Sequence, residues 1–164
     1  MSEEKATTVQ EQQQELNDQM LIRRDKLAQY EADGVYPFGQ RFVVQQHAAT
    51  IKDNFRDFED QPVTVAGRLM TIRSHGKTAF ANIRDLTGDI QIYLRKDILG
   101  EDVYKHVKML DMGDIVGIEG HVFRTHMGEI TIKVNKLTLL SKSLRPLPEK
   151  WHGLKDTELR YRQR

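Results

Sequence analysis

The residues best suited to chemistry lie in the stretch KTAFANIRDLTGDIQIY, at positions 77–93. If this stretch forms two strands around a turn, Ala79, Ala81 and Ile83 share one face. Phe80 then stands on the opposite, polar face, although burying its ring would stabilise the fold by roughly 1.5–3 kcal/mol. An aromatic ring held among polar side chains is suited to stacking against a flat ligand.

A set of polar side chains is expected around that ring. The hairpin register that keeps the aliphatic residues inward pairs Phe80 with Tyr93 and Asn82 with Gln91. With outward positions on two other predicted strands, the candidate face carries Arg73, Phe80, Gln91, Tyr93 and Glu129. Proteins read single-stranded RNA with such a set, because a splayed-out base lies on an aromatic ring while polar groups bond its edges.

Glu129 narrows the choice of base. A carboxylate accepts a hydrogen bond from the N3–H of uracil, whereas cytosine presents a bare N3 acceptor that a carboxylate repels. Arg73 and Gln91 can donate to carbonyl oxygens of the same base. The residues alone leave an alternative open, since exposed aromatics on sheets often only pack beneath a loop or an appended helix. The predicted N-terminal helices are candidates for such a cover over Phe80.

The elements that must position this set are short strands. Alternating hydrophobicity predicts strands over 63–73, 78–84, 89–95, 114–125 and 129–140, and helical spacing predicts a helix over 99–110. Gly67 interrupts the first strand, where a bulge would turn Thr71 and Arg73 outward. The hairpin at 78–94 should pair Ile83 with Ile90 in the core.

The last predicted strand contributes Glu129 to the candidate face. Its aliphatic residues Ile130, Ile132 and Val134 point inward, so Glu129, Thr131 and Lys133 should point outward. Five strands with one helix between the third and the fourth are the arrangement of the OB-fold. The expected fold class is therefore mainly β: a five-stranded OB-fold Greek-key barrel with N-terminal α-helices. The fold alone does not give the function.

Residues outside the barrel divide into three segments. Residues 1–12 are rich in Gln and Glu and are expected to form a disordered tail. Residues 13–60 are expected to be an N-terminal helical extension, with one helix ended by Gly34 and a second capped by Thr50. The anticipated barrel covers 61–141, and 142–164 reads as a linker towards a domain beyond these residues.

Composition sets limits on the class of protein. The 164 residues include no cysteine, which excludes disulfides and fits a reducing, cytoplasmic location. No window is apolar enough for a membrane span, and the scattered histidines predict no metal site. Residues 1–60 hold seven Lys and Arg against twelve Asp and Glu, and residues 61–164 hold eighteen against twelve. A basic barrel half favours a polyanionic partner, although the excess is mild.

Three stretches carry a family resemblance: AGRLMTIRSHGKTAFANIRDLTGDIQIY, GDIVGIEGHVFRTHMGEITIKV and SLRPLPEKWHGLKDTELRYRQR. They resemble the N-terminal anticodon-binding domain of class II lysyl-tRNA synthetases of bacterial type, over roughly residues 15–164. The related aspartyl and asparaginyl enzymes share the barrel. The stretches RRDKLAQYEADGVYPFGQRF and RPLPEKWHGL are similar to the lysyl enzymes only.

The resemblance implies a role for each member of the face. In that family a barrel phenylalanine and a glutamine sandwich the middle anticodon base, a uridine, and an arginine and a glutamate read its edge. The matching positions here are Phe80, Gln91, Arg73 and Glu129. Apart from the resemblance, further candidate RNA contacts are Arg23, Arg24, Arg68, Lys77, Asn82 and Tyr93. For Arg23 and Arg24, on the first predicted helix, a solvated helix face is the favoured alternative.

The same resemblance implies what these residues lack. Family members continue into a catalytic domain that binds ATP, magnesium and lysine and helps form a homodimer. No residue here is expected to be catalytic or to bind a cofactor, so the 164 residues alone should be inactive. The expected partner is the anticodon loop of lysine tRNA. Two alternatives are a free-standing OB-fold module for single-stranded nucleic acid and a purely structural interaction domain.

Overall fold

The protein is described by a computed structural model that covers residues 2–38 and 41–146, with side chains from Thr8 onward. The expected linker 142–164 therefore falls largely outside the described residues, as do its arginines 160, 162 and 164. The helices are α1 (Ser2–Ala32), α2 (Ala48–Asp53), α3 (Phe55–Phe58), α4 (Lys96–Leu99) and α5 (Glu101–Val107). The strands are β1 (Pro62–His75), β2 (Thr78–Arg84), β3 (Asp89–Arg95), β4 (Ile115–Arg124) and β5 (Ile130–Ser141).

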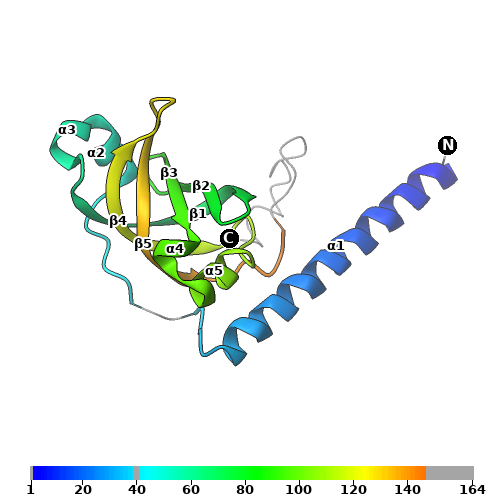
Figure 1. Ribbon diagram of the computed structural model, residues 1–164. Coiled ribbons are helices and arrows are strands. Elements are labelled where there is room, and N and C mark those ends of the chain that lie inside the picture. The colour runs from blue at the N-terminus through cyan, green and yellow to red at the C-terminus, as the bar shows by residue number, and fades with distance from the viewer. Residues whose placement is uncertain (1, 39–40, 147–164) are drawn as a thin grey trace.

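The five strands close into a barrel in the order β1-β2-β3-β5-β4 (Figure 1). Every neighbouring pair is antiparallel except β3 and β5, which run parallel. The inward side chains are aliphatic on every strand, and Leu69, Ile92 and Ile132 have no exposed surface. Burial of this alternating set is the main stabilising contribution to a small barrel. The predicted OB-fold architecture is confirmed.

The register of the β2–β3 hairpin is the one predicted. Ile83 pairs with Ile90 on the core side, and Phe80 pairs with Tyr93 on the outer side. The irregularity in β1 lies elsewhere than predicted, because the register shifts between Leu69 and Thr71 and not at Gly67. Thr71 is exposed as expected, since the shift turns it outward.

Gly67 meets a different structural need. A Cβ atom at this position would lie 2.8 Å from the carbonyl oxygen of Arg84 on β2. Only glycine allows so close an approach of two backbones inside a paired strand. The glycine signal in the sequence therefore marked close packing rather than a bulge.

The connection between β3 and β4 contains two short helices in place of the single helix predicted over 99–110. Gly100 separates α4 from α5 and has a φ of 88°, which favours glycine. Tyr104 and Val107 of α5 are buried against the barrel. The Tyr104 hydroxyl donates a hydrogen bond to the carbonyl oxygen of Gly76 at 3.2 Å, and this bond ties α5 to the β1–β2 turn.

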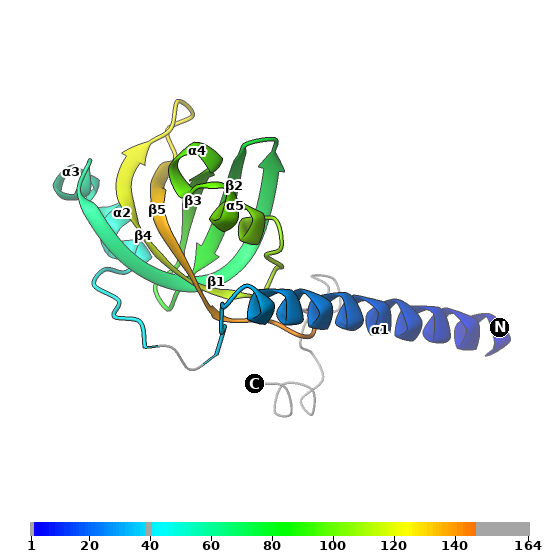
Figure 2. The same cartoon turned by 60° about the horizontal axis from the view of Figure 1, so that its bottom comes forward.

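Helix α1 begins at Ser2, so residues 2–12 are helical where a disordered tail was predicted. No glycine or proline interrupts residues 2–32, and Gln, Glu and Ala are good helix formers. Side-chain bonds such as Gln14 to Asp18, at 3.1 Å, link successive turns. The helix ends before Gly34, as predicted. Its N-terminal part extends away from the barrel (Figures 1 and 2).

The last third of α1 is fixed to the barrel by a charged cluster. Lys142 is buried, and its Nζ lies 2.7 Å from Asp111 Oδ2 and 2.9 Å from Asp114 Oδ2. Lys26 of α1 reaches Asp111 at 2.8 Å. The Ser143 backbone N–H donates to Asp114 Oδ1 at 2.8 Å. The barrel unit therefore extends past the boundary predicted at 141, because Lys142 and Ser143 are bound to it.

Arg23 belongs to the same attachment and is a correction to the predicted RNA contacts. Its side chain is only 8% exposed. Its Nη1 atom donates to the carbonyl oxygens of Met112, Ser143 and Arg145 and to the Ser143 hydroxyl, at 3.0–3.4 Å. A guanidinium used in this way joins α1 to the barrel and is not available to a phosphate.

Helix α2 is capped from a distance. Its N-cap residue is His47 and not Thr50, which lies inside the helix. The Asp85 carboxylate, in the β2–β3 turn, accepts a hydrogen bond from the Ala48 N–H at 2.7 Å. Burial raises the pKa of Asp85, but hydrogen bonds from Thr87 and from three backbone N–H groups outweigh it and leave that pKa lowered.

Candidate nucleic-acid interface

The predicted ring pair forms on the outer face of the hairpin. The centroids of Phe80 and Tyr93 lie 4.6 Å apart, with the ring planes inclined by 26°. Both side chains are half-buried, whereas the alternate residues Ala79 and Leu94 are fully buried in the core. One side of the Phe80 ring therefore rests on Tyr93, and the ring still presents surface to solvent.

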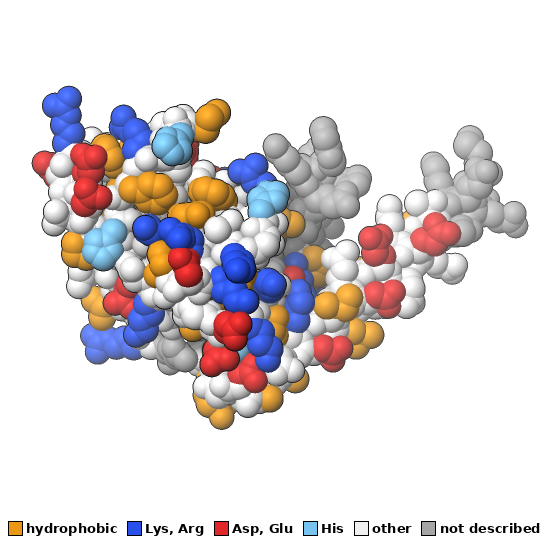
Figure 3. Space-filling model, viewed as in Figure 1, with side chains coloured by type: hydrophobic (Ala, Val, Ile, Leu, Met, Phe, Trp, Pro, Cys, Tyr) orange, Lys and Arg blue, Asp and Glu red, His pale blue; other side chains and the backbone are white. Residues whose placement is uncertain are grey.

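A third ring, Phe123 of β4, extends the pair. Its centroid lies 6.1 Å from that of Tyr93, at an interplanar angle of 57°. Hydrophobic side chains gather on the face over β3, β5 and β4, with basic and His side chains beside them (Figure 3). The sequence prediction missed Phe123, although strand alternation outward from the buried Val122 would have placed it there. We call Phe80, Tyr93 and Phe123 the aromatic row.

Gln91 lies in register with Asn82 of β2 and with Thr131 of β5. Thr131 was expected to be exposed, but it is fully buried on the outer side of the sheet. Its hydroxyl donates to the Glu129 carbonyl oxygen at 3.2 Å, so its polar atom is satisfied without solvent. Thr131 thus supports the backbone of the face and cannot contact a base.

Glu129 stands directly before β5, where a tight turn fixes its backbone. The Glu129 N–H donates to the Thr125 hydroxyl at 3.1 Å, and the Thr125 N–H donates to the Glu129 carbonyl at 2.9 Å. Gly128, with a φ of 89°, allows the turn. The Glu129 side chain is exposed and has no ion-pair partner among the described residues. It is free to accept a hydrogen bond from a ligand.

Arg73 of β1 lies in register with Phe80, so its side chain starts beside the ring. The side chain is exposed, and within the described part of the chain it has no carboxylate partner. Asn82, two pairs further along, donates its amide N–H to the Thr71 hydroxyl at 3.1 Å. The strand register therefore brings Arg73, Phe80 and Gln91 onto one surface, with Glu129 at its edge.

The remaining predicted contacts are scattered. Lys77 is exposed in the β1–β2 turn, and Arg68 is exposed on β1 beyond the register shift. Arg24 is exposed on α1, which attaches near Lys142, at the far end of β5 from Glu129. The contacts of α1 with the barrel thus lie away from the Phe80 ring. In the structure, α1 does not cover the Phe80 ring.

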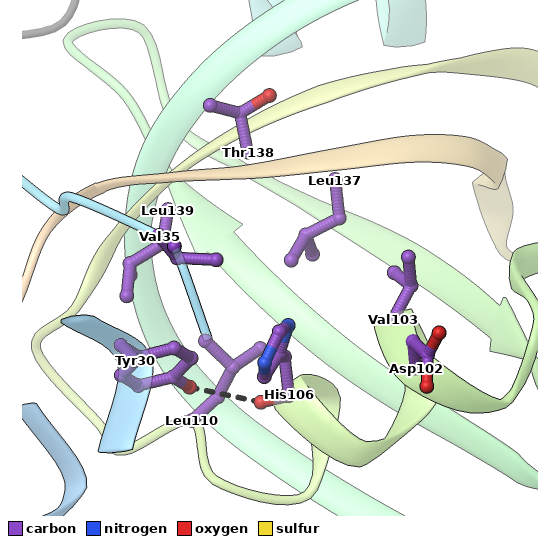
Figure 4. A pocket seen from close by; sticks show the side chains of 10 residues that line it. Tyr30, Val35, Asp102, Val103, His106, Leu110, Leu137, Thr138 and Leu139 are labelled. Atoms are coloured by element: carbon purple, nitrogen blue, oxygen red, sulfur yellow. Dashed lines mark hydrogen bonds between the residues drawn. The ribbon is translucent and has the colours of Figure 1, made fainter. Parts of the chain in front are cut away.

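A separate apolar cavity of about 320 Å³ lies where α1, α5 and β5 meet (Figure 4). Tyr30 donates its hydroxyl to the His106 carbonyl oxygen at 2.9 Å along one wall. His106 Nε2 lies 2.9 Å from Asp33 Oδ2, and this bond, with one from Gln29, lowers the pKa of Asp33. These contacts hold the end of α1 against α5, and the cavity shares no residue with the aromatic row.

The described residues offer neither a metal centre nor a membrane-spanning helix. No group of three or more His, Asp or Glu side chains there is placed to hold a metal ion. No helix among them is long and apolar enough to span a membrane. The outer face around the aromatic row is therefore the leading candidate for a functional site.

Comparison with known proteins agrees with this geometry. Residues 63–140 match the tRNA anti-codon family, described as an OB-fold nucleic acid binding domain. The chain is 53% identical over 148 residues to a lysine-tRNA ligase of Moorella thermoacetica, covering 90% of this chain and 30% of that protein. It is 55% identical over 143 residues to the lysine-tRNA ligase of Syntrophomonas wolfei, covering 87% and 29%.

The chain thus spans about 30% of the length of the curated relatives it matches. The match includes the N-terminal helices, since for Pelotomaculum thermopropionicum it extends over 152 residues at 52% identity. The resemblance drawn from the sequence is confirmed. The chain is a homologue of lysine-tRNA ligases, and its barrel belongs to the family of OB-fold nucleic acid binding domains.

Proposed function

We propose that the barrel binds the anticodon loop of lysine tRNA and reads the middle base, a uridine, on the face around Phe80. The observation that carries this proposal is the Phe80–Tyr93 stack at 4.6 Å, on the outer side of a barrel homologous to lysine-tRNA ligases. A half-buried ring supported on one side and open on the other is a stacking platform for a base.

Stacking on Phe80 supplies affinity for a base, and the polar residues supply selectivity among the four bases. Uracil offers one N–H donor between two carbonyl oxygens. Glu129 accepts from that N–H, and Arg73 and Gln91 donate to the oxygens. Cytosine would place an acceptor against the Glu129 carboxylate and lose this bond. The three polar residues come from β1, β3 and the turn before β5, so the folded barrel is needed to assemble them.

The wider activity rests on the relatives. A lysine-tRNA ligase joins lysine to tRNA, and we place ATP, magnesium and the lysine site in the part of the relatives that this chain does not match. Class II chemistry, the homodimer and a cytoplasmic location belong to the same proposal. In this scheme the barrel holds the anticodon end of the tRNA, and residues 1–164 alone do not catalyse the ligation.

The test is binding of the full chain to a 17-nucleotide anticodon stem-loop carrying UUU, and to loops whose middle base is C, A or G. The expected result is tightest binding to U at two salt concentrations. Raising the salt concentration should weaken the binding of all four loops by a similar factor, because the protein makes the same phosphate contacts with each of them. Equal affinity for all four middle bases would refute base reading and favour the free-standing, sequence-tolerant nucleic-acid module.

A further inference from the structure

The cavity where α1, α5 and β5 meet lies apart from the aromatic row and takes no part in the proposed RNA site. Its volume of about 320 Å³ falls within the range of small-molecule sites, roughly 300–1,000 Å³. A cavity of about 150 Å³ is enough to hold benzene, so this one has room for a ligand of two fused rings.

The walls of the cavity are mainly apolar and come from all three elements. Tyr30 of α1, Leu110 after α5 and Leu139 of β5 are buried and form its inner side. Val103 and Leu137 are only partly buried, and they lie across the cavity from Tyr30 (Figure 4). A ligand in the cavity would remove the surface of these two side chains from water, which favours binding of an apolar ring system.

One polar side chain in the wall is left with an acceptor atom. The Tyr30 hydroxyl already donates to the His106 carbonyl oxygen at 2.9 Å. His106 Nε2 lies 2.9 Å from Asp33 Oδ2, and because a carboxylate can only accept, Nε2 carries the proton. In the neutral ring Nδ1 is then an acceptor, so His106 suits a ligand that donates a hydrogen bond.

The charge at the edge of the cavity is negative. Asp102 of α5 lies there beside Val103 (Figure 4), and its carboxylate has no ion-pair partner in the described part of the chain. The basic side chain at this end of α1 is Lys105, whose Nζ lies 3.7 Å from Asp33 Oδ2. Lys105 does not line the cavity. A carboxylate beside an apolar space favours a ligand that joins a cation to a hydrophobic body.

We propose that this cavity binds a small aromatic amine. The ring system lies against Tyr30 and Leu137, and the ammonium group faces Asp102 at the edge. The bound amine touches α1, α5 and β5 together, so it stabilises the attachment of α1 to the barrel. This inference goes beyond the proposed function and does not depend on it, because the cavity shares no residue with the aromatic row.

The test uses three ligands that share an indole ring and differ in the charge of the side chain: tryptamine, tryptophol and indolepropionate. Calorimetric titration of the full chain at neutral pH measures each affinity. Tryptamine should bind about two- to fivefold more tightly than the neutral tryptophol, the scale of one exposed ion pair. Indolepropionate should bind most weakly, because Asp102 repels its carboxylate.

Two substitutions on α5 test the role of Asp102. Asp102→Asn should abolish the preference for tryptamine over tryptophol. Glu101→Gln is the matched control, since it removes the same charge one residue away, at a side chain that pairs with Lys96 at 3.4 Å and does not line the cavity. The preference should survive Glu101→Gln.

Two further variants locate the bound ligand. Val103→Phe fills the cavity from its partly exposed side and should abolish binding of tryptamine and tryptophol alike, with thermal unfolding as the check on its fold. Phe80→Ala should leave both affinities unchanged, because the ring lies outside the cavity. The comparison of three ligands uses the unchanged protein, so it decides the question even if Val103→Phe fails to fold.

The inference is overturned if none of the three ligands shows saturable binding, if all three bind equally, or if Asp102→Asn and Glu101→Gln behave alike. Loss of tryptamine binding in Phe80→Ala would overturn it too, by placing the amine on the aromatic row. Stem-loop titrations of the same protein test the proposed function separately, and none of these outcomes changes their expected result.

Discussion

The ring of Phe80 packs on the ring of Tyr93 with centroids 4.6 Å apart, and this contact leaves Phe80 half-buried. The pair comes from directly opposite positions on two antiparallel strands, so the hairpin itself sets its geometry. A platform built in this way exists before any ligand arrives, and little ordering is needed when a base binds.

Phe80→Ala should weaken binding of lysine tRNA by roughly 1–3 kcal/mol, the usual contribution of one base-aromatic stack. The fold should survive, because the ring lies on the outer side of the sheet. Fluorescence anisotropy with a labelled stem-loop measures the affinity, and thermal unfolding checks the fold. Leu86→Ala, at a fully exposed residue of the β2–β3 turn, is the matched control and should bind normally. Unchanged affinity for Phe80→Ala would remove the ring from the site.

Glu129→Gln should narrow the preference for U over C at the middle base. The neutral amide can donate to cytosine N3 as readily as it accepts from uracil N3–H, so the carboxylate loses its power to discriminate. Paired titrations with UUU and UCU loops give the ratio of affinities. Glu119→Gln removes a carboxylate of β4 that is paired with Lys136 and should keep the ratio of the unchanged protein. An unaltered ratio for Glu129→Gln would discredit edge reading by this residue.

Lys142→Met should lower the free energy of unfolding by about 3–5 kcal/mol, the usual cost of removing one partner from a buried ion pair. The reason is that Asp114, with no exposed side-chain surface, would lose its cation. Urea titration followed by circular dichroism measures the change. Lys136→Met, at an exposed pair, should change stability by less than about 1 kcal/mol. Equal effects of the two substitutions would contradict the assigned role of the cluster.

Acid should weaken the same cluster. Burial raises the pKa of Asp111, but hydrogen bonds from Lys142 and Lys26 outweigh it, so the pKa lies below its usual value. A carboxyl whose folded pKa is lowered adds stability that is complete above its unfolded pKa, about 3.9, and is lost as the pH falls through the folded pKa. The urea concentration at the midpoint of unfolding, measured between pH 2 and 6, should therefore decrease once the pH falls below about 4.

Lys26→Met gives the control for this acid dependence. It removes one of the two cations that hold the Asp111 pKa down, at a side chain 28% exposed. The acid-sensitive loss of stability should then be smaller, because less of the pKa depression remains. An identical pH profile in the two proteins would show that Asp111 does not govern the acid limb.

Alternating hydrophobicity predicted the barrel and the hairpin register, because a strand displays its inner and outer faces at every second residue. It placed Phe80, Gln91 and Tyr93 together without any other information. It could not find that Arg23 is buried, since a run of basic residues on a helix looks the same whether it faces solvent or carbonyl oxygens from distant loops. Alternation placed Thr131 on the outer face of β5 but did not show that it is buried there.

Distance along the chain also explains the misplaced helix cap. Thr50 has a side chain typical of an N-cap, yet the group that accepts from the first N–H of α2 is Asp85. Local patterns report local bonds, whereas this bond joins residues 37 positions apart. The start of α1 was misjudged for the opposite reason, because a polar composition concealed an uninterrupted run of good helix formers.

The parallel pairing of β3 with β5 has an evolutionary consequence. Gln91 and Thr131 are neighbours through this pairing, while the helices and the strand between them loop out and return. Insertions at exposed positions of the α4–α5 connection, away from the buried Tyr104 and Val107, can therefore accumulate without moving the two strands relative to each other. Homologues that differ at those positions should still share the outer face around Phe80 and Gln91.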